Sequence, residues 1–154
     1  MDIKTLLENG QFPIEGIIVS KDTAENELLS IGGETVSNNK DLRTILFEEN
    51  KVKFLGETFF GEFIFSEKKL YEITLEPIVL GVNAPHWPDE NYEKIKYDFC
   101  TSLLKRYLKL EINENNTEAC YKNSGFRIVC NRNLGGHSQG CGGNIVVIFK
   151  DESK

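Results

Sequence analysis

The sequence lacks the motifs that most often reveal a function. Its 154 residues include four cysteines, but no Cys-x-x-Cys pair that would indicate a zinc ribbon or a thioredoxin-type redox site. Glycine-rich phosphate-binding motifs are also missing. The first residues have neither the basic nor the apolar region of a signal peptide. The charge-free run near the middle, Pro77 to Pro88, is too short to span a membrane. We therefore expect a cytoplasmic protein with reduced thiols and no membrane partner.

The charge is negative and unevenly distributed. The net charge is −6; residues 1–77 hold 15 acidic against 8 basic residues, whereas residues 78–154 hold 9 against 10. An acidic half disfavours nucleic acid as a partner, because phosphate binding needs a basic surface. It favours a basic protein, whose approach the field would accelerate. Simple solubility would produce the same excess of acidic residues.

Three short elements are predicted before the middle of the chain. Asp2 is a good N-cap for a helix that ends near Asn9, since Gly10 follows. Residues 15–20 are apolar enough for a strand. Leu28, Leu29 and Ile31 indicate a second short strand between glycine and asparagine turns.

The central residues predict a β-hairpin made of Thr58–Phe65 and Leu70–Leu80. Its apolar faces coincide if Phe65 lies opposite Tyr71 and Phe63 opposite Ile73. That pairing needs a three-residue loop, 67–69, because a two-residue turn would place Phe63 opposite a glutamate. The other face of the hairpin would be acidic and partly apolar, with Glu62, Glu72 and Glu76 beside Phe60 and Ile64.

The strongest helical pattern runs from Asp89 to Leu108. Its predicted apolar stripe consists of Tyr92, Ile95, Phe99, Leu103 and Tyr107. Three strands are expected after it, at 117–122, 126–130 and 145–149. Strands grouped around one main helix predict an α+β fold: an antiparallel β-sheet packed on one amphipathic helix, with a short N-terminal helix, in a single domain over residues 1–154.

A glycine-rich segment between the last two strands contains the residues best suited to chemistry. Cys130, His137 and Cys141 could bind zinc, with Cys120 or Cys100 as a fourth ligand, although this spacing is not a common one. The same residues could form a Cys–His nucleophile pair, or Cys130 and Cys141 a disulfide. A metal- or thiol-dependent enzyme is therefore one hypothesis. A structural hairpin loop, in which glycines supply positive φ angles, is the simpler alternative.

Two further groups of residues have both a functional and a structural interpretation. The strand-spaced glutamates Glu62, Glu72 and Glu76 could form a glycosidase-like pair, but the solvent-exposed face of a sheet has the same pattern. His86 and Trp87 could line a small-ligand pocket. A buried, hydrogen-bonded histidine in a connecting segment explains the same sequence.

The later part of the chain resembles a known functional class. The pattern is Phe59-Phe-Gly-x-Phe-x-Phe-x4-Leu-Tyr-x-Ile-x-Leu75, then Trp87-Pro88 and a helix containing Phe99-Cys100, and finally Gly142-Gly-Asn-Ile-Val-Val-Ile148. Over residues 50–150 it is similar to small proteins of Gram-positive bacteria, some of which look like immunity proteins of polymorphic-toxin or contact-dependent growth inhibition systems.

The resemblance implies a non-enzymatic protein that binds and neutralises a cognate toxin and needs neither cofactor nor metal. The expected toxin is a nuclease, whose active-site surface is usually basic. Acidic and aromatic side chains suit an interface with such a surface. The expected partner-binding residues are Glu57, Glu62, Glu72, Glu76 and Trp87.

Overall fold

The computed structural model describes residues 2–38, 41–79, 90–132 and 142–150. The described residues form the helices α1 (Ile3–Glu8), α2 (Glu25–Ser30) and α3 (Glu90–Lys105). The strands are β1 (Phe12–Ile14), β2 (Ile17–Val19), β3 (Glu34–Asn38), β4 (Leu42–Phe54), β5 (Glu57–Ser66), β6 (Lys69–Pro77), β7 (Glu111–Ile112), β8 (Glu118–Lys122), β9 (Phe126–Asn131) and β10 (Ile145–Phe149).

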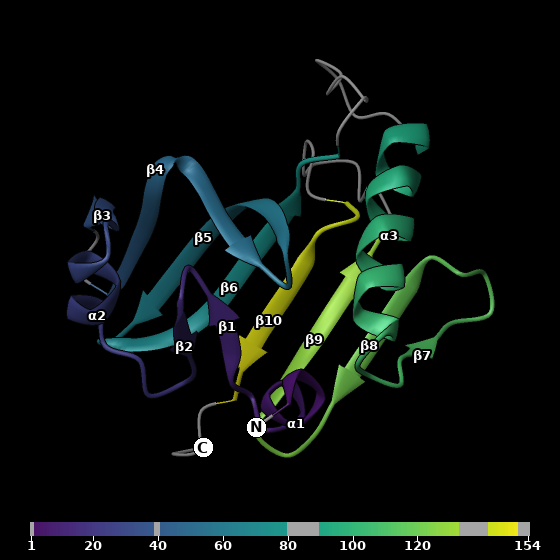
Figure 1. The fold of residues 1–154 in the computed structure, drawn as a ribbon, viewed down its shortest axis with the longest axis horizontal. Helices are drawn as coiled ribbons and strands as arrows, with labels where there is room; N and C mark the ends of the chain where they lie inside the picture. The colour runs from purple at the N-terminus through teal and green to yellow at the C-terminus, as the bar shows by residue number, and fades with distance from the viewer. Residues whose placement is uncertain (1, 39–40, 80–89, 133–141, 151–154) are drawn as a thin grey trace.

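The strands form one antiparallel ten-stranded sheet, which confirms the predicted α+β fold with one main helix (Figure 1). The order is β2-β1-β4-β5-β6-β10-β9-β8-β7, and β3 pairs with β4 beside this path. Residues on β5, and those on β6 from Glu72 onward, alternate between the two faces, so Phe59, Phe63 and Ile73 lie on one buried face. This face forms one side of the hydrophobic core.

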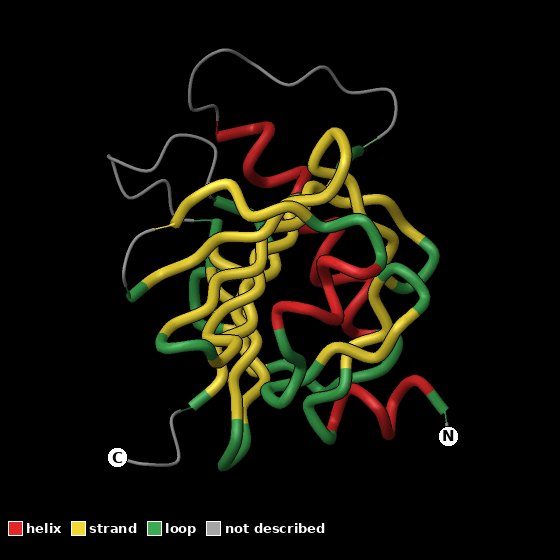
Figure 2. The backbone as a smooth tube through the Cα atoms, turned by 90° about the vertical axis from the view of Figure 1, so that its left-hand side faces the viewer, coloured by secondary structure: helices red, strands yellow, loops and turns green. Residues whose placement is uncertain are grey.

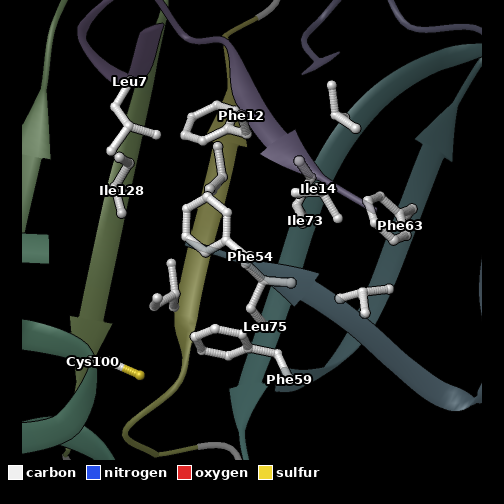
Figure 3. Packing of buried hydrophobic residues seen from close by; sticks show 14 of the residues in the cluster. Leu7, Phe12, Ile14, Phe54, Phe59, Phe63, Ile73, Leu75, Cys100 and Ile128 are labelled. Carbon is white, nitrogen blue, oxygen red and sulfur yellow. The ribbon is translucent and has the colours of Figure 1, made fainter. Parts of the chain in front are cut away.

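The sheet curls around that core. The pairing of β4 with β5 shifts between Leu46 and Lys51, and Glu49 and Asn50 in the shifted region have positive φ angles. The bend carries β1 over the core, where the Phe12 ring lies 5.7 Å from the Phe126 ring. β1 and β9 are far apart in the strand order, yet their side chains meet across the core (Figure 3).

All three helices pack on the concave, buried face of the sheet. The Phe99 ring of α3 lies 6.3 Å from the Phe59 ring. Leu7 of α1 and Leu28 of α2 are fully buried in the same hydrophobic cluster. In Figure 2 the described helices lie on one side of the long strands. Within the described ranges, therefore, no helix covers the opposite, convex face.

The structure confirms the predicted N-terminal helix but not the predicted strand at Leu28, Leu29 and Ile31. The Asp2 carboxylate accepts a hydrogen bond from the Thr5 N–H at 2.8 Å, which confirms the N-cap of α1. The expected strand at Leu28, Leu29 and Ile31 is wrong, because these residues belong to α2 and its C-terminal cap. Leu28 is buried there while its neighbours are exposed, which is the pattern of a short amphipathic helix.

The predicted strand at 15–20 is a hairpin in the structure. β1 and β2 pair from Phe12–Val19 to Ile14–Ile17, and Glu15 and Gly16 form the turn. Both turn residues have positive φ angles. This conformation is typical of the tight type I′ turn. Glu15 and Gly16, which were predicted to begin a strand, therefore form the turn between β1 and β2.

The β5–β6 hairpin has the predicted Phe63–Ile73 pair but a different turn. Phe65 lies opposite Leu70, not Tyr71, because the turn has two residues, Glu67 and Lys68. A β-bulge at Tyr71 restores the alignment of the apolar faces. Tyr71 is consequently 46% exposed instead of buried. The predicted three-residue loop is therefore wrong, because the bulge and not the loop length aligns the apolar faces.

The buried face of the main helix matches the predicted stripe only in part. Leu103 is buried and Phe99 packs against the core, but Ile95 is exposed. The rest of the buried face lies outside the predicted stripe and includes Glu93, Lys96, Tyr97, Cys100 and Leu104.

The β5–β6 turn offers a test of this backbone geometry. Glu67 and Lys68 have φ angles of 50° and 70°, which side chains other than asparagine and glycine adopt at a cost. Replacing the pair by Asn-Gly should raise the free energy of unfolding by about 0.5–1.5 kcal/mol. Urea denaturation would measure the change. Lys69→Gly, in the paired strand next to the turn, is the matched control and should lower stability; equal effects of both variants would contradict the assigned turn.

Candidate functional site

The convex face of the sheet, here called the outer face, is formed by residues that alternate with the core residues. Strand registers place its side chains in rows that cross the sheet. The first row, from β4 to β8, is Leu46, Glu62, Thr74, Val146, Val129 and Cys120. The second row is Thr44, Ile64, Glu72, Ile148, Arg127 and Lys122.

The centre of the outer face is apolar. Val146 and Ile148 on β10 and Val129 on β9 are half-buried, although no described helix lies over them. On β5, Ile64 is half-buried and Phe60 is 38% exposed. Single exposed apolar residues are ordinary, whereas a contiguous group on one face indicates an interaction surface.

The structure brings together two of the predicted partner-binding glutamates. Glu62 and Glu72 lie in adjacent rows of the outer face, and the Glu72 carboxylate accepts a hydrogen bond from the Thr74 hydroxyl at 3.2 Å. Glu57 does not join them. It pairs with Phe54, a core residue, and so lies at the rim of the concave face. Trp87 lies outside the described residues.

Glu76 also has the outer-face position, but its carboxylate is bound within the protein. Its Oε2 lies 2.9 Å from Nζ of Lys96, a helix residue that is fully buried. Because α3 packs on the concave face, this ion pair links the two faces around the end of the sheet. Glu76 therefore tethers the helix to β6.

Lys96 is the centre of a buried polar cluster. Its ammonium also donates to Oδ1 of Asn144 at 3.3 Å and lies 3.6 Å from Oε2 of Glu93. The Tyr92 ring is 5.1 Å away, within cation–π range. Burial raises the pKa of the Tyr92 hydroxyl, so the ring stays neutral beside this cation. A buried charge of this kind is stable only when such partners surround it.

Sequence reasoning missed Glu93 and Lys96 because charged helix residues are usually solvent-exposed. A signal was available. Glu93, Lys96 and Cys100 follow the i, i+3, i+7 spacing of one helix face, and cysteine is among the residue types most often buried. A lysine on the same face as a buried cysteine predicts a buried charge with a partner.

Two glycines of the glycine-rich segment allow the chain before β10 to lie close to α3 beside this cluster. A Cβ on Gly143 would lie 2.7 Å from the carbonyl oxygen of Glu93, and its φ of +82° also favours glycine. A Cβ on Gly142 would overlap the Glu93 carboxylate. These glycines therefore have a packing role. Residues 133–141, with His137 and Cys141, lie outside the described residues.

The described cysteines are buried or half-buried free thiols. Burial raises the pKa of Cys130 to about 12 and raises that of Cys100 well above its usual value. Both thiols are consequently protonated near neutral pH and are poor nucleophiles. No group of three metal-ligating side chains occurs in the part of the chain that the structure describes. The enzyme hypothesis based on Cys130, His137 and Cys141 stays a prediction.

A shallow hollow lies at the far end of the outer face, beside the edge strand β7. Its volume is about 370 Å³. It is lined by Glu111, Ile112, Asn113, Glu118, Cys120, Lys122, Arg127 and Val129. Half-buried Cys120 and Val129, which both line it, are directly paired across β8 and β9.

The tether formed by Glu76 predicts unequal effects of two similar substitutions. Glu76→Gln removes the closest carboxylate from buried Lys96 and should lower the free energy of unfolding by about 1–3 kcal/mol. Glu72→Gln, on the same strand and face but hydrogen-bonded only locally, should change it by less than about 0.5 kcal/mol. Chemical denaturation of both variants measures this, and equal stabilities would contradict the tether.

The cysteine environments predict a labelling order. At about pH 8, iodoacetamide should modify half-exposed Cys120 in the folded protein while Cys100 and Cys130 react only on unfolding. Peptide mass spectrometry with and without urea distinguishes the sites. Rapid modification of Cys130 in the native protein would show that its thiol is activated, and would favour the enzyme hypothesis.

Comparisons with known proteins add no functional assignment. No protein-family model, curated protein or solved structure matches the chain. Within the described residues, no helix is both long and apolar enough to cross a membrane. The outer face, with its apolar centre and its glutamates, is therefore the candidate functional site in the described part of the chain.

Proposed function

We propose that this protein is a non-enzymatic binding module: an immunity protein that binds a toxin and occludes its active site. The observation that carries the proposal is the outer face, a wide surface with an apolar centre that no described helix covers. Protein interfaces combine an apolar core with a polar rim. Here Val146, Ile148 and Ile64 form the centre, and Glu62 and Glu72 lie beside them.

Charge and sequence resemblance support the kind of partner. The net charge of −6 would attract a basic protein and accelerate its association. The similarity of residues 50–150 to immunity-type proteins points in the same direction. A nuclease is the proposed toxin class, because its active site must attract phosphate and is therefore basic.

Inhibition by occlusion also agrees with the chemistry of the described residues. It needs a rigid surface but no nucleophile, and buried Cys100 and Cys130 have pKa values raised by desolvation. The ten-stranded sheet supplies the rigid support. An immunity protein must act where its toxin acts, so we propose that it works in the cytoplasm.

The proposal predicts protection by this protein and its loss on charge reversal. Co-expression with the toxin domain encoded beside this gene should restore growth, and the purified proteins should bind. Glu72→Lys combined with Glu62→Lys should weaken binding at least about tenfold, chiefly by slowing association. Surface plasmon resonance at several salt concentrations measures both rates.

The matched control is Glu8→Lys, which reverses an exposed charge on α1, away from the outer face. It should leave the dissociation constant nearly unchanged. Absence of a toxin gene, or a toxin that does not bind, would overturn the proposed function. Normal binding by the double variant would remove the outer face from the interface.

A further inference from the structure

The outer face has an exposed aromatic ring, that of Phe60, with a carboxylate on each of two sides. Phe60 on β5 is 38% exposed and pairs directly with Glu76 on β6. Residues paired in this way have Cβ atoms about 5 Å apart on the same face. Glu62 follows two residues later on the same strand and face, about 7 Å along β5. The ring is therefore the apolar part of a patch that is otherwise acidic.

The carboxylate of Glu76 is held in place but stays accessible. Its Oε2 lies 2.9 Å from the ammonium of fully buried Lys96, while the Glu76 side chain is 30% exposed. This is the carboxylate's one hydrogen bond among the described residues. A carboxylate has about four acceptor positions, so it can hold Lys96 and still accept from a second cation. Because Lys96 already fixes the Glu76 side chain, little conformational entropy is lost when a partner binds there.

The lysines near Phe60 do not cancel the negative charge of this patch. Lys51 pairs with Phe60 from β4, and its ammonium lies 3.0 Å from a carboxylate oxygen of Glu49. Buried Lys96 has carboxylate oxygens of two glutamates at 2.9 Å and 3.6 Å. The two lysines therefore face three carboxylates, and Glu62 adds a fourth. Among the described residues the charge around the ring is negative, which suits a cation of the partner.

The ring decides which cation suits the patch. A lysine ammonium is a compact, strongly hydrated charge. A guanidinium is planar and more weakly hydrated, so it stacks on an aromatic face and also binds a carboxylate through two parallel hydrogen bonds. Attraction to the ring operates within about 6 Å of its centre. A ring beside fixed carboxylates therefore favours arginine, which is also enriched among the residues that dominate interface energies.

We propose that an arginine of the toxin binds here, with its guanidinium stacked on Phe60 and hydrogen-bonded to Glu76 and Glu62. This inference rests on the proposed function and names the side chain by which the partner is recognised. The row of Phe60 adjoins that of Val146, so a partner on the apolar centre also reaches the ring. Arginine is over-represented where proteins bind phosphate, so capture of such a residue would occlude the substrate site of a nuclease.

The test compares two substitutions of one exposed side chain. Phe60→Leu keeps an apolar residue but removes the ring, and should weaken binding of the toxin domain encoded beside this gene at least about tenfold. Phe60→Tyr keeps the ring and should change the dissociation constant less than about twofold. The matched control is Ile18→Ala, which shortens an exposed apolar side chain on β2, outside the rows of the outer face, and should have little effect.

The identity of the cation is tested by replacing the toxin's arginines with lysine, one at a time. One replacement should weaken binding to the wild-type protein at least about fivefold but have little further effect on Phe60→Leu, because both changes remove the same contact. Wild-type affinity of Phe60→Leu, or effects that simply add for every arginine, overturns the inference while the proposed function stands. Failure of the wild-type protein to bind the toxin overturns the proposed function. If the free protein forms dimers that Phe60→Leu dissociates, a second copy is the occupant and the inference is wrong.

Discussion

The arrangement of this protein depends on a single apolar sheet face. Phe59, Phe63 and Ile73 project to one side of β5 and β6, and side chains of each described helix are buried against that side. The bend in β4 brings β1 to the same side, where Phe12 packs on Phe126 and Phe149. Among the described residues, the elements that cover the sheet lie on this face, and none of the described helices covers the other. Folding and the candidate interface therefore have the same origin.

One end of the sheet is held by charge instead of apolar contact. Lys96 extends from the concave side of the sheet to Glu76, with Asn144 and Glu93 as additional neighbours. This ion pair contributes less to stability than its geometry suggests, because the fully buried Lys96 ammonium loses its water, whereas the Glu76 carboxylate stays partly exposed. What it does specify is position: α3 can meet the end of β6 in only one register. Gly143 adds to this by allowing the helix backbone to lie against the chain before β10.

The sequence was sufficient for the architecture where periodicity was long and unambiguous. The antiparallel sheet, the main helix and the last three strands follow from alternation and from amphipathic spacing. Leu28 shows where this reasoning ends, since a six-residue helix and a short strand have nearly the same pattern. The bulge at Tyr71 is invisible to strict alternation, because one extra residue shifts every later position.

The candidate site was predictable only in part, for a different physical reason. Glu62 and Glu72 follow from alternation on β5 and β6, but their neighbours Ile148 and Arg127 come from strands much later in the sequence. Which strand lies beside β6 is decided by global topology, and local pattern contains no information about it. For the same reason, the sequence of the β5–β6 hairpin alone predicted an acidic surface, without the apolar and basic residues of β10 and β9 beside it.

The strand order changes the meaning of that acidity. Placing β10 and β9 next to β6 sets Arg127 about two strand spacings from Glu72, too far for a direct ion pair but close enough for one partner to contact both. Charges arranged in this way select a partner more stringently than a uniform field does, because a partner in the wrong orientation meets like charges. The net charge of −6 accelerates the approach of basic proteins in general. Beyond β10 the outer face has charges of both signs, with Arg127 and Lys122 near Glu111 and Glu118, and this mixture is what would distinguish one of them from the rest.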